Sequence, residues 1–182
     1  MRADVARAHP GRVVWLKPTS EALAHLELLC GYDADLRGDA NRLTNRLRAL
    51  MVAHWPALER ALGERLDSRG LLAVLQQYPS GPALQAAGVD QITAALKGQR
   101  VRRPENLARR LYEAALAQSV TITGERTAAQ SVVDLAGQLA TLLARRGALE
   151  NEIEQGFFDL PEAAILRSLP GIGPRLGARI AR

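Results

Sequence analysis

The chain has 182 residues, a formal net charge of +5, 47% hydrophobic residues and only 4% aromatic residues. The length fits one domain with or without an appended arm, and the apolar share can build a core, which excludes wholesale disorder. The low aromatic content argues against an all-β sandwich, whereas abundant Ala, Leu and Arg favour helices. The single cysteine excludes an intramolecular disulfide and any zinc site built from several cysteines.

The N-terminal stretch has no clear helical pattern. Val13–Leu16 is a short apolar run between the breakers Pro10-Gly11 and Lys17-Pro18, and it would form a short strand remnant or an anchoring loop. No run of about 18 apolar residues is present, and Met1–Gly11 lacks the apolar segment of a secretory signal. We therefore expect a soluble cytoplasmic protein without a membrane partner.

Two long helices with apolar residues at every third or fourth position are predicted. The first is capped by Thr19 or Ser20 and ends at Trp55-Pro56, and the second spans about Glu125–Gln155. Such stripes suit either an antiparallel coiled-coil arm or a stalk between two copies, so we expect a homo-oligomer formed through the coiled coil. The first stripe contains Leu26, Leu29, Leu36, Leu43, Leu47 and Leu50 with Asp33 and Ala40 in its gaps, and the second contains Val132, Leu135, Leu139, Leu142, Leu149 and Ile153 with Arg146 as its one polar position.

The middle of the chain is punctuated by Pro and Gly and predicts a compact cluster of short helices. We expect these helices at Leu58–Leu62, Leu71–Gln77, Pro82–Ala87, Val89–Leu96 and Pro104–Gln118. Ser119–Thr123 is β-prone but lies between helices, so it is interpreted as an extended linker. The fold class is therefore all-α, with long coiled-coil helices around a helical cluster.

The last segment is typical of a helix-hairpin-helix, in which two helices flank a tight turn that binds the DNA backbone. A helix through Ser168 precedes Gly171, Ile172 and Gly173, where the two glycines allow a sharp turn and Ile172 packs inward. Arg175 and Arg179 then lie four residues apart on one helical face, where they can reach phosphates. An ordinary helical bend with Pro-Gly punctuation is the alternative interpretation.

Two clusters of basic residues favour a polyanionic partner, although a solvated helix face would have the same composition. The residues are Arg42, Arg46 and Arg48 in the first cluster, and Lys97, Arg100, Arg102, Arg103, Arg109 and Arg110 in the second. No catalytic or metal-binding residue can be assigned, because neither the aspartates near Asp33 nor Cys30 and the histidines form a converging pattern.

Five segments in order resemble Piv/MooV-type insertion-sequence transposases, the "IS-one-ten" family. They are Tyr32–Leu36, Asn41–Leu50, His54–Glu59, Pro82–Gly88 and Ile165–Pro174. The resemblance implies a DNA transposase or site-specific recombinase, active in a bacterial cytoplasm, nucleoid-associated when bound to DNA, and in some members guided by a structured RNA. It also implies an RNase H-like domain whose four carboxylates hold a divalent metal such as Mg²⁺, and a C-terminal domain with a catalytic serine.

Ala3–Arg7 resembles the stretch that follows the last family aspartates, so the resemblance implies that all four acids precede this chain and the serine follows it. We therefore expect a catalytically incomplete fragment with no cofactor of its own. The expected segments are a domain tail at 1–56, a helical linker at 57–123, a coiled-coil helix at 124–158 and the start of the C-terminal domain at 159–182. A small helix-hairpin-helix accessory protein that binds DNA, and a coiled-coil adaptor without nucleic-acid affinity, are the alternatives.

Overall fold

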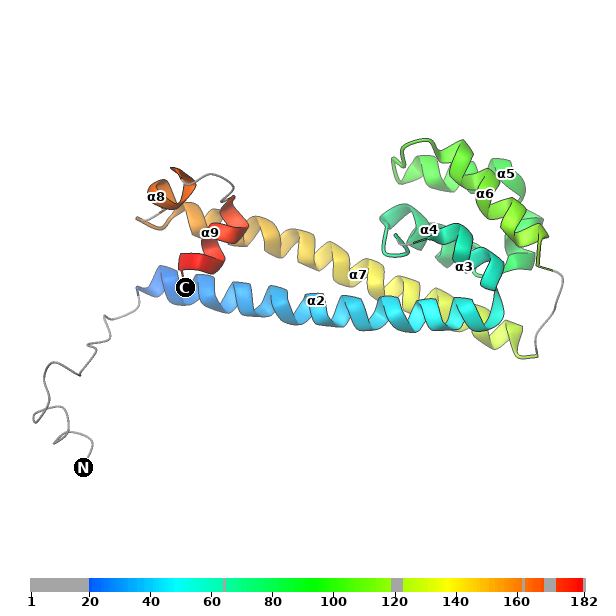
Figure 1. The fold of residues 1–182 in the computed structure, drawn as a ribbon, viewed down its shortest axis with the longest axis horizontal. Helices are drawn as coiled ribbons and strands as arrows, with labels where there is room; N and C mark the ends of the chain where they lie inside the picture. The colour runs from blue at the N-terminus through cyan, green and yellow to red at the C-terminus, as the bar shows by residue number, and fades with distance from the viewer. Residues whose placement is uncertain (1–19, 64, 119–122, 162, 169–172, 182) are drawn as a thin grey trace, which may run out of the picture. The chain divides into compact units, whose positions relative to one another are not determined.

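The computed structural model describes residues 20–63, 65–118, 123–161, 163–168 and 173–181. Within these ranges the chain is helical and contains no strand, which confirms the all-α class (Figure 1). The stretch Val13–Leu16, for which a strand remnant was expected, and the linker residues 119–122 lie outside the described residues. The helices are α2 (Glu21–His54), α3 (Pro56–Leu62), α4 (Arg69–Gln77), α5 (Gly81–Gly98), α6 (Pro104–Leu116), α7 (Glu125–Phe158), α8 (Ala163–Ser168) and α9 (Pro174–Ala181).

The chain divides into two compact units, which are described separately. The larger, called the core unit, is Tyr32–Glu150, and the smaller, called the terminal unit, combines Met1–Gly31 with Asn151–Arg182. This division does not test the four segments expected from the sequence, which stay a prediction. No helix among the described residues is long and apolar enough to span a membrane.

In the core unit, α2 and α7 run in opposite directions along each other. Arg146 on α7 contacts Asp33 on α2, while Glu125 at the start of α7 accepts a hydrogen bond from the Trp55 indole that follows α2, at 2.9 Å. Partners from opposite ends of the two helices can pair in this way only when the helices are antiparallel. Both helices are thus paired within one chain. This arrangement is the one that an antiparallel arm requires, while the coiled coil itself stays a prediction.

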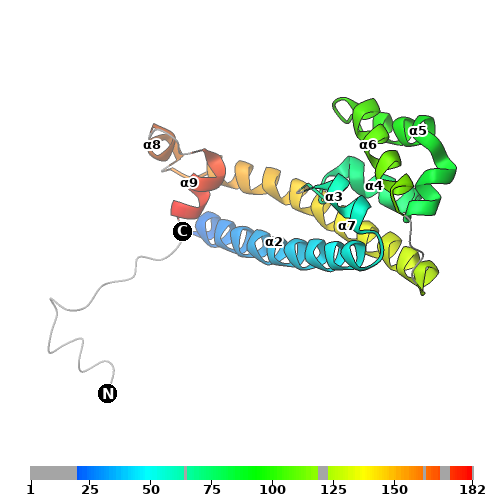
Figure 2. The same cartoon turned by 45° about the vertical axis from the view of Figure 1, so that its right-hand side comes forward.

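One apolar core joins this helix pair to the short helices. Leu47 and Met51 of α2, Leu139 of α7 and Leu84 of α5 are fully buried, and Trp55 is nearly so. Burial of large side chains from all of these helices supplies the main stabilisation of the unit. Within the cluster, α5 and α6 form the most closely packed pair, and they remain side by side in both views (Figure 2).

Asp33 interrupts the apolar stripe of α2, Arg146 interrupts the apolar stripe of α7, and the two side chains form an ion pair with each other. Arg146 Nε donates to Asp33 Oδ1 at 3.0 Å, and each side chain is only 16% exposed. Glu150 lies 3.7 Å from the Arg146 guanidinium on the other side. Because the two polar positions meet each other, the stripe accommodates both without leaving a buried charge unpaired.

α5 is kinked at Gly88, whose non-helical φ of 70° separates the two short helices expected on either side of it. The end of α7 differs from the sequence prediction. α7 does not end before Gly156 but continues through Phe158. In the terminal unit Phe157 is fully buried against Gly177 of α9, so packing extends the helix past the end of its predicted pattern.

The helix-hairpin-helix stays a prediction. Helices α8 and α9 flank the expected turn, but Gly171 and Ile172 lie outside the described residues. Gly173 is exposed directly before α9, and Arg175 and Arg179 belong to the helical backbone of α9. The close approach of Gly177 to Phe157 fixes where α9 packs on the end of α7, because a Cβ at Gly177 would lie 2.5 Å from the ring.

Candidate nucleic-acid interface

The connection between α5 and α6 has an unusual backbone. Arg100 and Arg103 adopt φ values of 55° and 57°, in the left-handed region that residues with a Cβ rarely occupy. Arg103 is also the residue before α6, and no side chain caps that helix. Left-handed residues of this kind cost on the order of 1 kcal/mol each, so the surrounding packing must hold the turn in place.

A close contact between Val101 and Gly70 provides that packing. Val101 lies so near the start of α4 that a Cβ on Gly70 would be 2.2 Å from its Cγ2. Only glycine leaves room for this side chain. The contact brings Arg69, the first residue of α4, beside the turn, and we call Arg69, Arg100, Arg102 and Arg103 together the arginine turn.

The side chains of the arginine turn are all exposed. Among the described residues, no carboxylate lies within ion-pair distance of any of them. The nearby acid in sequence, Glu105, is instead paired with Lys97 at 2.8 Å, and the hydrogen bond from Lys97 together with the backbone of Glu105 lowers the pKa of that carboxyl. The positive charge of the arginine turn is therefore not neutralised within the described structure.

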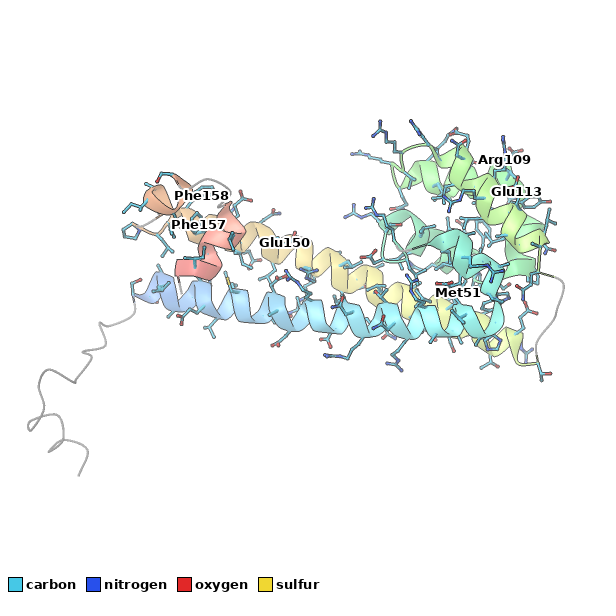
Figure 3. The ribbon with its side chains drawn as sticks, viewed as in Figure 1. Met51, Arg109, Glu113, Glu150, Phe157 and Phe158 are labelled. Atoms are coloured by element: carbon cyan, nitrogen blue, oxygen red, sulfur yellow. The ribbon has the colours of Figure 1, made fainter. Side chains whose placement is uncertain are left out.

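The two remaining members of the second basic cluster differ from each other. Arg110 donates to the carbonyl oxygen of Ala61 at 2.8 Å, which ties α6 to the end of α3. Arg109 is exposed on α6, one turn before Glu113 (Figure 3). Arg110 thus has a structural partner, whereas Arg109 adds a further charge to α6.

The first basic cluster is more engaged in internal contacts. Arg48 donates to Glu59 at 2.9 Å and to the Gly63 carbonyl at 3.1 Å, which joins α2 to α3. Arg42 pairs with Asp39 one turn earlier on the same helix. Only Arg46 is exposed without a described partner. The structure does not bring these residues together as a set of uncompensated charges.

The arginine turn has the properties of a phosphate-binding surface. Guanidinium groups bind phosphate oxygens with two parallel hydrogen bonds, and a fixed backbone reduces the entropy lost when they do so. The sequence alone did not identify Arg69, because it lies far from the second cluster along the chain and the fold brings it there. The glycine that follows it was the available signal, since glycine permits close approach of another segment.

No site for metal chemistry was found in the part of the chain that the structure describes. No group of three or more His, Cys, Asp or Glu residues is placed to hold a metal ion there. Asp33 is bound by Arg146 and by Arg37, at 3.0 Å and 3.4 Å. Its position is accounted for by the pairing of the two long helices.

Comparison with known proteins identifies relatives over most of the chain. It is 34% identical over 176 residues to the uncharacterized 43.6 kDa protein of insertion element IS110 from Streptomyces coelicolor. It is 39% identical over 158 residues to the 44.8 kDa protein of insertion element IS116 from Streptomyces clavuligerus. It is 30% identical over 163 residues to the 42 kDa protein of insertion element IS900 from Mycobacterium paratuberculosis.

These alignments cover 97%, 87% and 90% of this chain but only 44%, 39% and 41% of the respective relatives. The chain therefore spans less than half the length of the curated relatives that it matches. No family model and no solved structure matches the chain.

Proposed function

Because this chain belongs to the IS110 family of insertion-element proteins, we propose that it acts in DNA transposition and that it contributes by binding DNA. The family relationship supports the role in transposition. The exposed, uncompensated arginine turn supports the binding of a polyanion. DNA is the polyanion that an insertion-element protein has to engage.

The single observation that carries this proposal is the contrast within the second basic cluster. Lys97 and Arg110 are held by internal partners, whereas the arginine turn has none among the described residues. A fold that gives some basic side chains internal partners and leaves others exposed without one has a surface suited to phosphate contacts. Such contacts are independent of sequence and weakened by salt. Arg109 and Arg46 would add weaker contacts.

Arg175 and Arg179 of α9, with Gly171 to Gly173, are proposed as a second contact to the DNA backbone. Their support is that α8 precedes and α9 follows this segment, together with its glycine pattern. A structured guide RNA remains a proposed partner on the strength of the family resemblance, and a second copy of the chain on the strength of the apolar stripes of the two long helices.

We assign no strand-cleavage step to the described residues. In the family pattern, four carboxylates and a divalent metal such as Mg²⁺ activate the phosphodiester, and no residue here matches that set. Incubating the purified chain with Mg²⁺ and duplex DNA of an element end should leave the strands intact. Robust cleavage would contradict this part of the proposal.

Fluorescence anisotropy with a labelled duplex at several salt concentrations tests the binding function. The wild-type chain should bind duplexes of unrelated sequence with similar affinity, and log Kd should rise linearly with log salt. Replacing Arg102 and Arg103 with Ala should reduce the slope by about 2 units, since each phosphate contact contributes about 0.9.

The variant Arg60→Ala with Arg126→Ala is the matched control, because it removes the same charge from two exposed arginines outside the arginine turn. It should leave the slope nearly unchanged. Equal losses in the two double variants would show that net charge, not this surface, governs binding. Absence of any DNA binding at low salt would overturn the proposed function.

A further inference from the structure

A groove lined by both polar side chains and alanine methyl groups adjoins the arginine turn in the core unit. It has a volume of about 500 Å³, within the range of sites that hold a small ligand. The residues that line it are Arg69, Ala73, Gln76, Gln77, Gln99 and Ala140.

The glutamines of this groove have unused hydrogen-bonding groups. The side-chain amides of Gln77 and Gln99 have no hydrogen-bond partner among the described residues. Gln76 donates its Nε2 hydrogen to the Leu72 carbonyl at 3.2 Å, which leaves its Oε1 able to accept a bond. Each amide offers a donor and an acceptor side by side, which is the pattern that pairs with the edge of a nucleobase.

The groove and the arginine turn form one continuous surface. Arg69 belongs to both, and Gln99 directly precedes Arg100. The contact of Val101 with Gly70 holds the start of α4, which carries Arg69, against the α5–α6 connection that follows Gln99. A strand whose phosphates lie on the arginine turn would therefore present its next base to the groove.

We propose that this groove binds one unpaired nucleotide of a DNA strand, with adenine favoured. The inference rests on the proposed DNA-binding function and adds a base preference to it. The base lies with its face on the methyl groups of Ala73 and Ala140, its edge meets the amides of Gln77 and Gln99, and Arg69 contacts its phosphate. A glutamine amide pairs with adenine through two hydrogen bonds, to N6 and N7.

Twelve-nucleotide oligo-dT probes with one central dA, dC, dG or dT test this inference, because the four probes carry the same charge. Anisotropy titrations should show the dA probe bound about fivefold more tightly than the all-dT probe, the lower end expected for one amide pair in an open groove. Exchanging Gln77 and Gln99 for Met should abolish that difference while the all-dT affinity and its salt slope stay unchanged. The control Gln91→Met, at an exposed position of α5 outside the groove, should keep the preference.

The outcomes separate the inference from the function on which it rests. Equal affinity for the four probes, or a preference that survives in the Gln77 and Gln99 variant, would overturn the inference and leave DNA binding standing. If the corresponding oligo-rU probe with one central rA binds more tightly than the dA probe, the groove is assigned to RNA. That result would also overturn the inference that the groove binds a DNA nucleotide. If no single-stranded probe is bound while the folded chain still binds duplex DNA, the inference alone fails. If the folded chain binds neither, both the function and the inference fail.

Discussion

The core unit contains two arginine environments with opposite consequences. In the seam between α2 and α7, Arg146 is 16% exposed and bound to Asp33 at 3.0 Å. At the arginine turn, Arg102 is exposed and no described carboxylate is near it. The same residue type therefore stabilises the fold in one place and is available for a ligand in the other.

The comparison shows that the neighbours of a charge, and not the charge itself, determine its role. Arg146 is the single basic residue in an apolar stripe, and its removal would leave the Asp33 carboxylate partly buried without its closest partner. In the arginine turn the backbone is strained at Arg100 and Arg103 and anchored by the contact of Val101 with Gly70, while the side chains remain exposed. Four predictions sharpen this contrast.

The largest effect on stability is expected from removing Arg146, which lies between α2 and α7. Arg146→Ala should lower the free energy of unfolding by about 2–3 kcal/mol, because it leaves the mostly buried Asp33 carboxylate without its closest salt-bridge partner. Urea unfolding followed by circular dichroism measures this loss. The neighbouring Arg145 is a matched control, since it is exposed and lies 4.9 Å over the Tyr32 ring, and Arg145→Ala should cost only about 0.5–1 kcal/mol.

A double-mutant cycle tests whether Arg146 acts through Asp33. The loss in the combined variant with Asp33→Ala should be smaller than the sum of the two single losses. Additive losses would show that the two side chains stabilise the unit independently and would contradict the pairing seen in the structure.

The second effect concerns the anchor of the arginine turn. Gly70→Ala should cost about 1–2 kcal/mol, because the new methyl group would overlap Val101 and displace the turn. It should also weaken DNA binding although no charge is removed. Gly98→Ala is the control, because no heavy atom lies within 4 Å of the Cβ position there, and it should be neutral in both assays.

Unchanged stability and affinity in Gly70→Ala would show that the turn does not depend on this contact. Thermal unfolding and anisotropy on the same two preparations provide the comparison.

The third effect separates the backbone of the turn from its side chains. Arg100→Gly should raise the free energy of unfolding by about 0.5 kcal/mol, since glycine adopts a φ of 55° without strain. DNA affinity should fall at the same time, because a guanidinium group is lost. Arg102→Gly should also bind more weakly but should gain no stability, since Arg102 has no positive φ.

A stability gain in Arg102→Gly equal to that in Arg100→Gly would contradict the assignment of strain. Differential scanning fluorimetry resolves the order of the two variants, and anisotropy at a fixed salt concentration gives the affinities.

The smallest effect is the pH dependence of the Lys97–Glu105 pair. Because the pKa of Glu105 is lowered from its ordinary value of 4.5, the pair stabilises the fold above that pH. The contribution is lost as the pH falls through the lowered pKa. Unfolding curves of the wild-type chain and Glu105→Gln should differ slightly at pH 7 and converge in acid.

High salt should erase this difference at every pH, because both side chains are more than half exposed. A difference that persists in high salt, or that grows in acid, would contradict the assignment of the shift to Lys97.

Much of the fold was predictable from local signals. Ser20 accepts a hydrogen bond from the Leu23 amide at 3.2 Å, as a helix cap does, and α2 ends at the predicted Trp55-Pro56 boundary. The two gaps in the apolar stripes, at Asp33 and Arg146, were visible as polar interruptions. Their pairing was not predicted, because the register between two helices far apart in sequence is set by packing.

The candidate site was predictable only in part. The second basic cluster contained Arg100, Arg102 and Arg103, but composition cannot distinguish an exposed arginine from one such as Arg110 that is bound to a carbonyl. Arg69 and the glutamine groove depend on the approach of α4 to the α5–α6 connection. That approach is a tertiary contact between Gly70 and Val101, for which the sequence offers only an isolated glycine.

The most direct test of the account measures two quantities on two variants: the free energy of unfolding in urea, and the salt-dependent affinity for duplex DNA. Arg102→Ala with Arg103→Ala should lose affinity and keep its stability, whereas Arg146→Ala should lose stability and keep its affinity wherever it is folded. Loss of affinity in Arg146→Ala equal to that in the turn variant, under conditions in which both are folded, would contradict the separation of the two roles.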